Sequence, residues 1–300
     1  MKQYMPLDRK PNLFVAGAPK CGTTSLAAWL SEHPNCYVTP KKEPHFFSNF
    51  MRNNMSLKAY EKLFSNVHTN HSTIVDASTS YFNNPRALRR ILAYNPSAKF
   101  ILMFRNPVDL AYSLHAEVLY RGVETEQVFE TAWRLQGLRK QGMGIPYSCR
   151  NPEMLFYRNQ CLLGGSLKKL LELVDSLSVH CIFLEDLKTN PRQCYMEALK
   201  FCGLSDDGRL EFPVYNRSKY HRFPRLNSTL QTLGLIRASA GLPGIGLVKA
   251  INRIGRKEQK RPLLRKEFKL ELYDEFRADI ALLEKLTGRD LSKWQPITEN

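Results

Sequence analysis

The residues best suited to chemistry lie near the start of the chain, in a loop that follows an apolar run. Residues 13–17 read Leu-Phe-Val-Ala-Gly, and Gly22 comes five positions after Gly17. A turn that contains Lys20 separates the glycines, and three hydroxyl residues and a helical apolar pattern follow. A buried strand that leads through such a turn into a helix brings backbone N–H groups and the positive end of the helix dipole together. This pattern predicts a binding site for an anionic group, to which Lys20 adds a mobile charge.

The position of the lysine distinguishes this loop from a Walker A loop, which reads GxxxxGK[ST] and carries its lysine directly after the second glycine. Here Gly17 and Gly22 keep the spacing, but Thr23 follows Gly22 and the lysine comes two positions before it. The phosphate cradle is therefore kept and its lysine is moved. An ordinary strand–turn–helix corner is the alternative.

The stretch Pro-Lys-Cys-Gly-Thr-Thr-Ser-Leu, residues 19–26, resembles the 5′-phosphosulfate loop of sulfotransferases that use 3′-phosphoadenosine 5′-phosphosulfate (PAPS). The resemblance implies an α/β fold with a P-loop-like open parallel β-sheet flanked by helices. It also implies that the loop binds the donor. The donor-binding residues it indicates here are Lys20, Cys21, Gly22, Thr23, Thr24 and Ser25.

A second anion motif follows the apolar run 99–104, where Arg105 ends the run and Pro107 marks the start of a helix. Ser113 comes eight positions after Arg105. In sulfotransferases, a strand-end arginine and a helical serine at this spacing hold the 3′-phosphate of PAPS, and the resemblance gives that role to this pair. A guanidinium suits the role because its planar fork makes two charge-assisted hydrogen bonds to a phosphate. A salt-bridged arginine and a serine bonded back along its helix are the alternative.

The segment Lys-Glu-Pro-His-Phe-Phe, residues 42–47, resembles the heparan sulfate branch, in which the glutamate serves as general base. The resemblance therefore gives the catalytic base to Glu43, with His45 as the next candidate. Lys41 and Lys42 would help to keep that carboxylate ionised and would face an acceptor. A solvated charge run is the alternative.

A late basic and aromatic loop resembles the loop that closes over the nucleotide in the glycan sulfotransferases. Ser218, Lys219 and Pro224 match it, whereas Tyr220 and His221 stand where glycine and arginine are expected. The donor-binding residues that this resemblance indicates are Lys219, Tyr220, His221 and Arg222.

Residues 76–82 resemble a region of the glycan enzymes that reads acidic-Lys-Thr-x-x-Tyr-Phe. Asp76 and Tyr81 match, and both are predicted to lie near the acceptor; Ala77 replaces the lysine. The identity of the acceptor therefore does not follow from the resemblance. Asp76 also imitates the strand-end aspartate of a P-loop kinase or NTPase, which is the main enzymatic alternative.

The chain has 300 residues with a net charge of +16, which indicates acidic partners. The charge makes a basic nucleic-acid-binding protein the alternative from another class, although no nucleic-acid motif accompanies it. We expect a nucleotide donor and an acceptor that is a glycan or another hydroxyl compound, with 3′,5′-diphosphoadenosine as the donor's product.

The first twelve residues contain no apolar signal region, and the chain has no run of 18 apolar residues. The seven cysteines are odd in number and form no CxxC pair, which argues against a disulfide framework and a zinc site. We expect a cytoplasmic enzyme that requires no metal.

Apolar runs separated by helical patterns predict parallel strands at 13–17, 73–76, 99–104 and 179–184. The predicted helices are 23–32, 56–65, 85–94, 107–120, 125–141, 155–175, 191–202 and 264–287. We expect one domain over 1–300. Its basic apolar segment 228–260 is predicted either to be a lid that contacts an anionic surface or to pack on the core.

Overall fold

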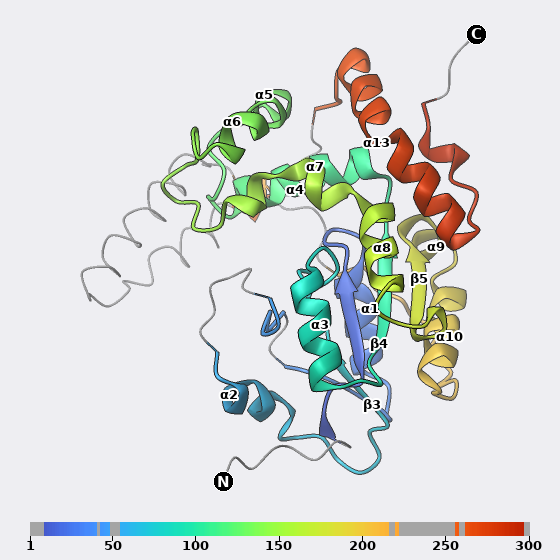
Figure 1. Ribbon diagram of the computed structural model, residues 1–300. Helices are drawn as coiled ribbons and strands as arrows, with labels where there is room; N and C mark the ends of the chain where they lie inside the picture. Colours follow the sequence, from blue (N-terminus) through green and yellow to red (C-terminus); the bar gives the residue numbers. More distant parts are fainter. Residues whose placement is uncertain are drawn as a thin grey trace. The chain divides into compact units, whose positions relative to one another are not determined.

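The computed structural model divides the chain into two compact units that alternate along the sequence (Figure 1). The first unit comprises Met1–Arg105, Leu163–Tyr215 and Ala278–Ser292, and the second comprises the remaining segments. Because the units alternate, no single cut separates them, and the prediction of one domain stays a prediction. The structure describes residues 9–40, 43–48, 55–215, 220–221, 256–257 and 262–296.

A five-stranded parallel sheet forms the centre of the first unit, in the order β2-β3-β1-β4-β5. The predicted α/β fold with an open parallel sheet is confirmed. The sequence did not predict β2, because three residues are too short to stand out as an apolar run. The strands are β1 (Leu13–Gly17), β2 (Cys36–Val38), β3 (Thr73–Asp76), β4 (Lys99–Phe104) and β5 (Val179–Phe183).

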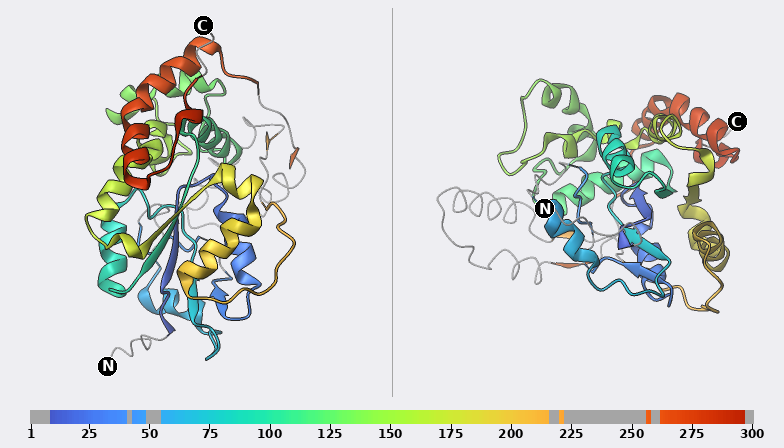
Figure 2. Two further views of the ribbon diagram at one scale, coloured as in Figure 1. Left: turned by 90° about the vertical axis from the view of Figure 1, so that its right-hand side faces the viewer. Right: turned by 60° about the horizontal axis from the view of Figure 1, so that its bottom comes forward.

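Helices cover both faces of this sheet, which explains why its strands are apolar throughout. Helices α1 (Thr23–Ser31) and α10 (Pro191–Cys202) lie on one face, and α3 (Pro85–Tyr94) and α8 (Leu163–Leu171) lie on the other (Figure 2). Strand β1 runs between β3 and β4, so the loops at the carboxyl ends of these three strands meet at one edge. In open α/β sheets this edge is where ligands bind.

Smaller elements complete the first unit. The predicted helix 56–65 is a helix followed by a 3-10 turn, and the predicted strand 179–184 ends one residue early because Leu184 begins a helix. These elements are α2 (Leu57–Glu61), η2 (Lys62–Phe64), η4 (Ser176–Ser178) and α9 (Leu184–Thr189).

The predicted helix 155–175 is interrupted, and its last part starts at a close approach between two backbones. A Cβ atom on Gly164 would come 2.4 Å from the carbonyl oxygen of Asp279. The carboxylate of Asp279 also accepts hydrogen bonds from the N–H groups of Gly164 and Gly165. Glycine is therefore required where α8 begins. The prediction of one continuous helix over 155–175 was wrong.

The second unit is mainly helical, and the predicted helix 125–141 is two short helices in it. Its elements are α4 (Pro107–Tyr120), α5 (Phe129–Arg134), α6 (Gln136–Lys140), η3 (Pro152–Leu155), α7 (Tyr157–Cys161) and the antiparallel pair β6 (Tyr220–His221) and β7 (Arg256–Lys257). Helix α13 (Lys266–Thr287) begins in this unit and ends in the first, and η5 (Ser292–Trp294) follows it. Pro107 occupies the first turn of α4, as predicted.

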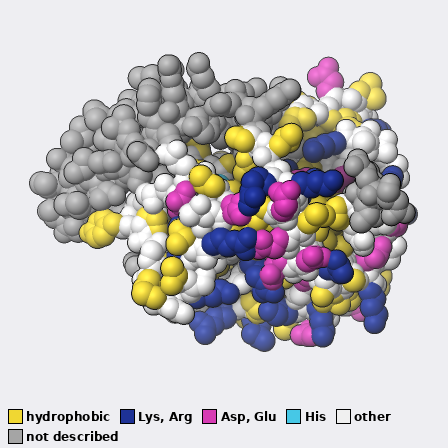
Figure 3. Space-filling model, turned by 90° about the horizontal axis from the view of Figure 1, so that it is seen from above, with side chains coloured by type: hydrophobic (Ala, Val, Ile, Leu, Met, Phe, Trp, Pro, Cys, Tyr) yellow, Lys and Arg dark blue, Asp and Glu magenta, His cyan; other side chains and the backbone are white. Residues whose placement is uncertain are grey.

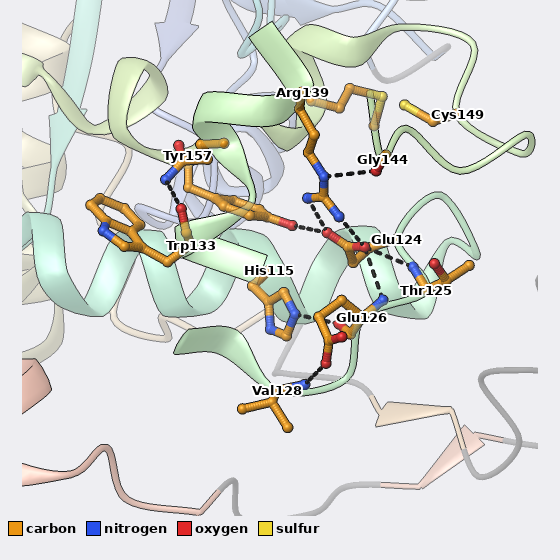
Figure 4. A network of polar contacts seen from close by, with 12 residues as sticks. His115, Glu124, Thr125, Glu126, Val128, Trp133, Arg139, Gly144, Cys149 and Tyr157 are labelled. Atoms are coloured by element: carbon orange, nitrogen blue, oxygen red, sulfur yellow. Dashed lines mark hydrogen bonds and ion pairs between the residues drawn. The ribbon is translucent and has the colours of Figure 1, made fainter. Parts of the chain in front are cut away.

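A buried ion pair that the sequence did not reveal lies inside the second unit (Figure 4). Glu124 accepts two hydrogen bonds from the guanidinium of Arg139, at 2.6 and 2.9 Å, and one at 2.6 Å from the hydroxyl of Tyr157. Its Oε1 also accepts the N–H groups of Thr125 and Glu126. Burial by itself would raise the pKa of Glu124, but the hydrogen bonds from Arg139 and Tyr157 outweigh it and hold that pKa below its usual value.

The last predicted helix is confirmed. Leu272, Phe276, Ile280 and Leu283 are buried along one face of α13, and Gly288 follows the helix with a φ of 67°. A left-handed glycine of this kind commonly ends a helix.

Charges of both signs are mixed on the face shown in Figure 3, where Lys and Arg side chains lie among Asp and Glu side chains. Much of the excess positive charge of the chain comes from residues 216–261. Residues 216–261 include eleven Lys and Arg residues and one acid, Glu258.

The predicted lid 228–260 lies outside the described residues apart from β7. None of the described helices has the length and apolar character needed to cross a membrane.

Candidate active site

The predicted anion loop joins β1 to α1 at the ligand-binding edge of the sheet. Gly17 and Gly22 have φ values of 144° and 94°, which favour glycine. A Cβ atom on Gly22 would also lie 2.7 Å from Cδ2 of Leu187. The N–H of Ala18 donates to the carbonyl of Met103 at 2.8 Å and fixes the loop to β4. The glycine spacing in the sequence therefore reflects both backbone conformation and close packing.

Helix α1 presents the amino-terminal end that an anion site requires. Gly22 is its N-cap, no side chain caps the helix, and its first turn contains no acidic residue. The positive end of the helix dipole is thus not neutralised by α1 itself. Burial raises the pKa of the Cys21 thiol well above its usual value, so this residue contributes to the loop as a neutral group.

Arg105 lies beside this loop. Its Nη1 donates to the carbonyl oxygen of Lys20 at 3.4 Å, so two predicted donor-binding residues meet.

Ser113 belongs to the second unit, on α4, and its role in the site stays a prediction. Its side chain is buried, with 1% of the residue exposed, and its Oγ has no hydrogen-bond partner. A buried hydroxyl without a partner costs about 1–3 kcal/mol, so its presence calls for an explanation. A phosphate oxygen of the donor is an acceptor that would satisfy it.

The other end of the predicted donor site begins at a segment packed along α1. Oγ of Ser25 accepts the N–H of Tyr215 at 3.1 Å, and the indole of Trp29 donates to the carbonyl of Pro213 at 3.1 Å. Residues 205–215 therefore lead the chain to the anion loop. Of the predicted residues that follow, Lys219 and Arg222 lie outside the described residues, and Tyr220 and His221 are described only as the backbone of β6.

The two candidates for the base form a close pair. Nε2 of His45 lies 3.2 Å from Oε2 of Glu43; the Glu43 side chain is 30% exposed and that of His45 is 5% exposed. Both residues have positive φ values, 55° and 52°, and Lys20 has a φ of 64°. Among the non-glycine residues that the structure describes, these three are the ones with positive φ. Such backbone costs about 1–3 kcal/mol per residue and is concentrated at functional sites.

Three consecutive hydroxyl residues after β3 hold this pair, a role that the sequence pattern did not indicate. We call Ser78, Thr79 and Ser80 the hydroxyl triplet. Ser78 Oγ accepts the N–H of His45 at 3.1 Å, and Thr79 Oγ1 donates to Oε1 of Glu43 at 3.3 Å. Ser80 Oγ lies 2.7 Å from Nδ1 of His45. Each member thus contacts Glu43 or His45, and Ser80 also contacts Ser48.

Asp76 and Tyr81, which were predicted to lie near the acceptor, are both fully buried. The Asp76 carboxylate accepts hydrogen bonds from Ser78, Tyr60 and Tyr81 at 2.6, 2.7 and 2.9 Å. Burial raises the pKa of Asp76, whereas these hydrogen bonds oppose that change. Through Ser78, Asp76 supports the hydroxyl triplet, and a role of either residue at the acceptor stays a prediction. Lys41 and Lys42 lie outside the described residues.

Comparisons with known proteins identify the family and the relatives that the chain resembles. The family described as the sulfotransferase domain matches residues 10–223. The bifunctional heparan sulfate N-deacetylase/N-sulfotransferase 1 of Caenorhabditis briggsae is 26% identical over 238 aligned positions, which cover 75% of this chain and 26% of that protein. The human heparan sulfate glucosamine 3-O-sulfotransferase 6 is 33% identical over 111 positions, which cover 37% of this chain and 31% of that protein. The chain thus matches about a quarter to a third of the length of these relatives.

A solved structure matches nearly the whole chain. It is the crystal structure of a sulfotransferase from Alicyclobacillus acidocaldarius, which is 26% identical, with a TM-score of 0.70. The match covers 95% of this chain and 98% of that chain.

Proposed function

The chain belongs to the sulfotransferase domain family, and from this membership we propose that it transfers the sulfuryl group of PAPS to a hydroxyl or amine of a carbohydrate acceptor. The observation that carries the proposal is the strained pair Glu43 and His45 at the same sheet edge as the anion loop. An anion site supplies a place for the donor, and a partly exposed carboxylate supplies a base. Sulfuryl transfer needs both.

The anion loop and Arg105 would hold the donor. Backbone N–H groups at the start of α1 face an anion without competition from a capping side chain. Lys20 would neutralise the negative charge that grows on the bridging oxygen as the sulfuryl group leaves. Positioning and charge stabilisation of this kind account for most of the catalysis of phosphoryl transfer, and the same applies to sulfuryl transfer.

Glu43 would accept the proton of the attacking group. Its carboxylate is partly exposed and is held by Thr79 and His45, so it is positioned without being buried. A positioned general base typically contributes a factor of about 100 to 10,000 in rate. The donor supplies the electrophilic sulfur, and the chain supplies orientation and proton removal.

The carbohydrate acceptor is supported by the relatives whose names state that they act on heparan sulfate. The basic residues between 216 and 261 favour an acidic glycan through long-range attraction. Such attraction is screened by salt, so the KM for an acidic acceptor should rise with ionic strength. A neutral acceptor used under the same conditions controls for effects of salt on the protein.

The test is transfer from ³⁵S-labelled PAPS to a panel of acceptors: N-desulfated heparan sulfate, a neutral oligosaccharide and a phenol. Label on either carbohydrate supports the proposal, and label on the phenol alone would overturn the carbohydrate acceptor. Thermal shift with 3′,5′-diphosphoadenosine and with ATP–Mg²⁺ tests the donor separately. Stabilisation by ATP–Mg²⁺ alone would favour a kinase.

We also propose that the enzyme acts in the cytoplasm. All seven cysteines are free, and five of them are buried. A reducing compartment suits a chain with this many thiols. Fractionation of cells that express the chain tests this, and recovery in a secreted or membrane fraction would contradict it.

A further inference from the structure

The hydroxyl triplet makes a directed set of contacts with the base pair. Ser78 links two groups, because its Oγ donates to the buried carboxylate of Asp76 and accepts the N–H of His45. The strained backbone of His45 is therefore tied to the end of β3. Thr79 and Ser80 contact the two side chains instead of the backbone. Three neighbouring residues thus fix the main chain of His45, its ring and the Glu43 carboxylate.

The contacts of the His45 ring determine which nitrogen carries the proton in the neutral imidazole. An ionised carboxylate only accepts hydrogen bonds, so Nε2, which faces Oε2 of Glu43, must be the protonated nitrogen. Nδ1 must then accept, and Ser80 must donate to it. Oγ of Ser48 lies 2.6 Å from Oγ of Ser80 and can donate to it in turn. All these hydrogen bonds then point from Ser48 toward Glu43.

We propose that the hydroxyl triplet is a positioning element for the base, in which Ser80 donates to Nδ1 of His45 and thereby holds the ring with its Nε2–H directed at the Glu43 carboxylate. This role rests on the proposed sulfuryl transfer, in which Glu43 is the base. The triplet residues act through the base pair. Ser80 is the sharpest member to test, because its contact is with a ring nitrogen whose hydrogen bonding can be observed directly.

The experiment records ¹⁵N resonances of histidine rings in the full chain labelled with ¹⁵N-histidine, with His45→Gln to assign the His45 signals. In the neutral ring of the wild type, we expect Nε2 to be protonated and Nδ1 to accept a hydrogen bond from Ser80. Ser80→Ala removes that donor and should move the Nδ1 resonance toward the position of an imidazole nitrogen without a hydrogen bond, while Nε2 stays protonated. Ser80→Thr keeps a hydroxyl and should preserve the wild-type Nδ1 resonance. An unchanged Nδ1 resonance in Ser80→Ala would overturn the proposal.

Two further variants separate loss of the hydrogen bond to Nδ1 from an effect on folding. Ser97→Ala removes an exposed hydroxyl and should leave the His45 resonances unchanged. Ser80→Cys keeps a side chain of similar size with only a weak donor, so it provides the same test if Ser80→Ala does not fold. The Cys variant should also move the Nδ1 resonance.

Turnover with labelled PAPS and N-desulfated heparan sulfate gives the functional readout. Ser80→Ala should lower kcat by up to about 100-fold, the loss that a misplacement of about 1 Å can cause, and leave the KM for PAPS unchanged. A wild-type chain without turnover would refute the proposed function and leave the Nδ1 measurement to decide whether Ser80 holds the His45 ring. A change in the Nδ1 resonance without loss of kcat would overturn the positioning role.

Discussion

Nε2 of His45 lies 3.2 Å from Oε2 of Glu43, and both residues hold left-handed backbone conformations, which residues other than glycine rarely adopt. Conformations of this kind persist only when the surrounding contacts enforce them. Ser78 fixes the N–H of His45, and the buried carboxylate of Asp76 in turn accepts the hydroxyl of Ser78. The strain at the base is therefore held by the end of a core strand.

Replacing Glu43 with glutamine should lower kcat by about 100- to 10,000-fold, because the amide cannot accept the proton of the acceptor. The affinity for 3′,5′-diphosphoadenosine, measured by calorimetry, should stay the same. Glu172→Gln changes an exposed glutamate and serves as the control. Near-normal turnover in Glu43→Gln would transfer the role of base to another residue, with His45 as the first candidate.

Replacing Ser113 with alanine should separate stability from binding. Loss of an unpaired buried hydroxyl should leave the free protein as stable or up to about 3 kcal/mol more stable in urea unfolding. The affinity for 3′,5′-diphosphoadenosine should nevertheless fall about ten- to a hundredfold, as expected for a lost hydrogen bond to a charged group.

Ser148→Ala is the matched control for this prediction, because Oγ of Ser148 is also buried without a partner. It should give a similar change in stability and leave nucleotide affinity unaltered. Equal affinities in wild type and Ser113→Ala would remove Ser113 from the donor site.

Replacing Gly22 with alanine should destabilise the protein and weaken nucleotide binding. The positive φ alone costs about 1–2 kcal/mol with a side chain, and the new Cβ would also press on Leu187. Gly142 has a φ of 85° with nothing within 4 Å of its would-be Cβ, so Gly142→Ala isolates the cost of φ. Urea unfolding should show a larger loss for Gly22→Ala, and its affinity for 3′,5′-diphosphoadenosine should fall at least about tenfold. Equal losses in the two variants would contradict the close packing.

The sequence predicted the central elements of the fold well, because their signals are local. The runs at 13–17, 73–76 and 99–104 are strands as predicted, since strands covered on both faces are apolar throughout. Pro107 and Gly288 mark helix ends through backbone conformation alone. Strand β2 was not predicted because three residues are too short to stand out as an apolar run, and the break within 155–175 was not predicted because it depends on the contact of Gly164 with Asp279. The break within 125–141 was not predicted either.

The candidate site divides in the same way. The spacing of Gly17, Lys20 and Gly22 indicated the anion loop, and the motif around Glu43 indicated the base. The hydroxyl triplet was missed because serine and threonine after a strand are common in loops, and only the fold places them against residues 43–45. The sequence did not show that Asp76 is buried, because a strand-end carboxylate looks the same in sequence whether it faces a ligand or the core.

The buried pair of Glu124 and Arg139 predicts a large cost for removing one partner. Arg139→Met should lower the free energy of unfolding by about 3–5 kcal/mol, because it leaves a buried carboxylate unpaired. A double variant with Glu124→Leu should recover much of this loss. Arg277→Met breaks an exposed ion pair with Asp274 and should cost no more than about 1 kcal/mol. Losses of similar size at the two sites, in urea unfolding, would show that Glu124 is solvated.

His115 should make stability depend on pH. Burial lowers the pKa of its imidazole, although its contact with the carbonyl of Glu126 and the nearby Glu124 oppose this and Arg139 adds to it. As pH falls through about 6.5, His115 takes up a proton in the unfolded chain before it does so in the folded chain, where its pKa is lower. Stability that is present at higher pH is therefore lost.

The urea concentration at the unfolding midpoint should therefore decrease as the pH is lowered from about 7.5 to 5.5. His115→Gln, which keeps a donor for Glu126, should reduce that decrease. It should not abolish it, because burial lowers the pKa of His180 as well. An unchanged fall in His115→Gln would mean that His115 is protonated equally in the folded and unfolded chains.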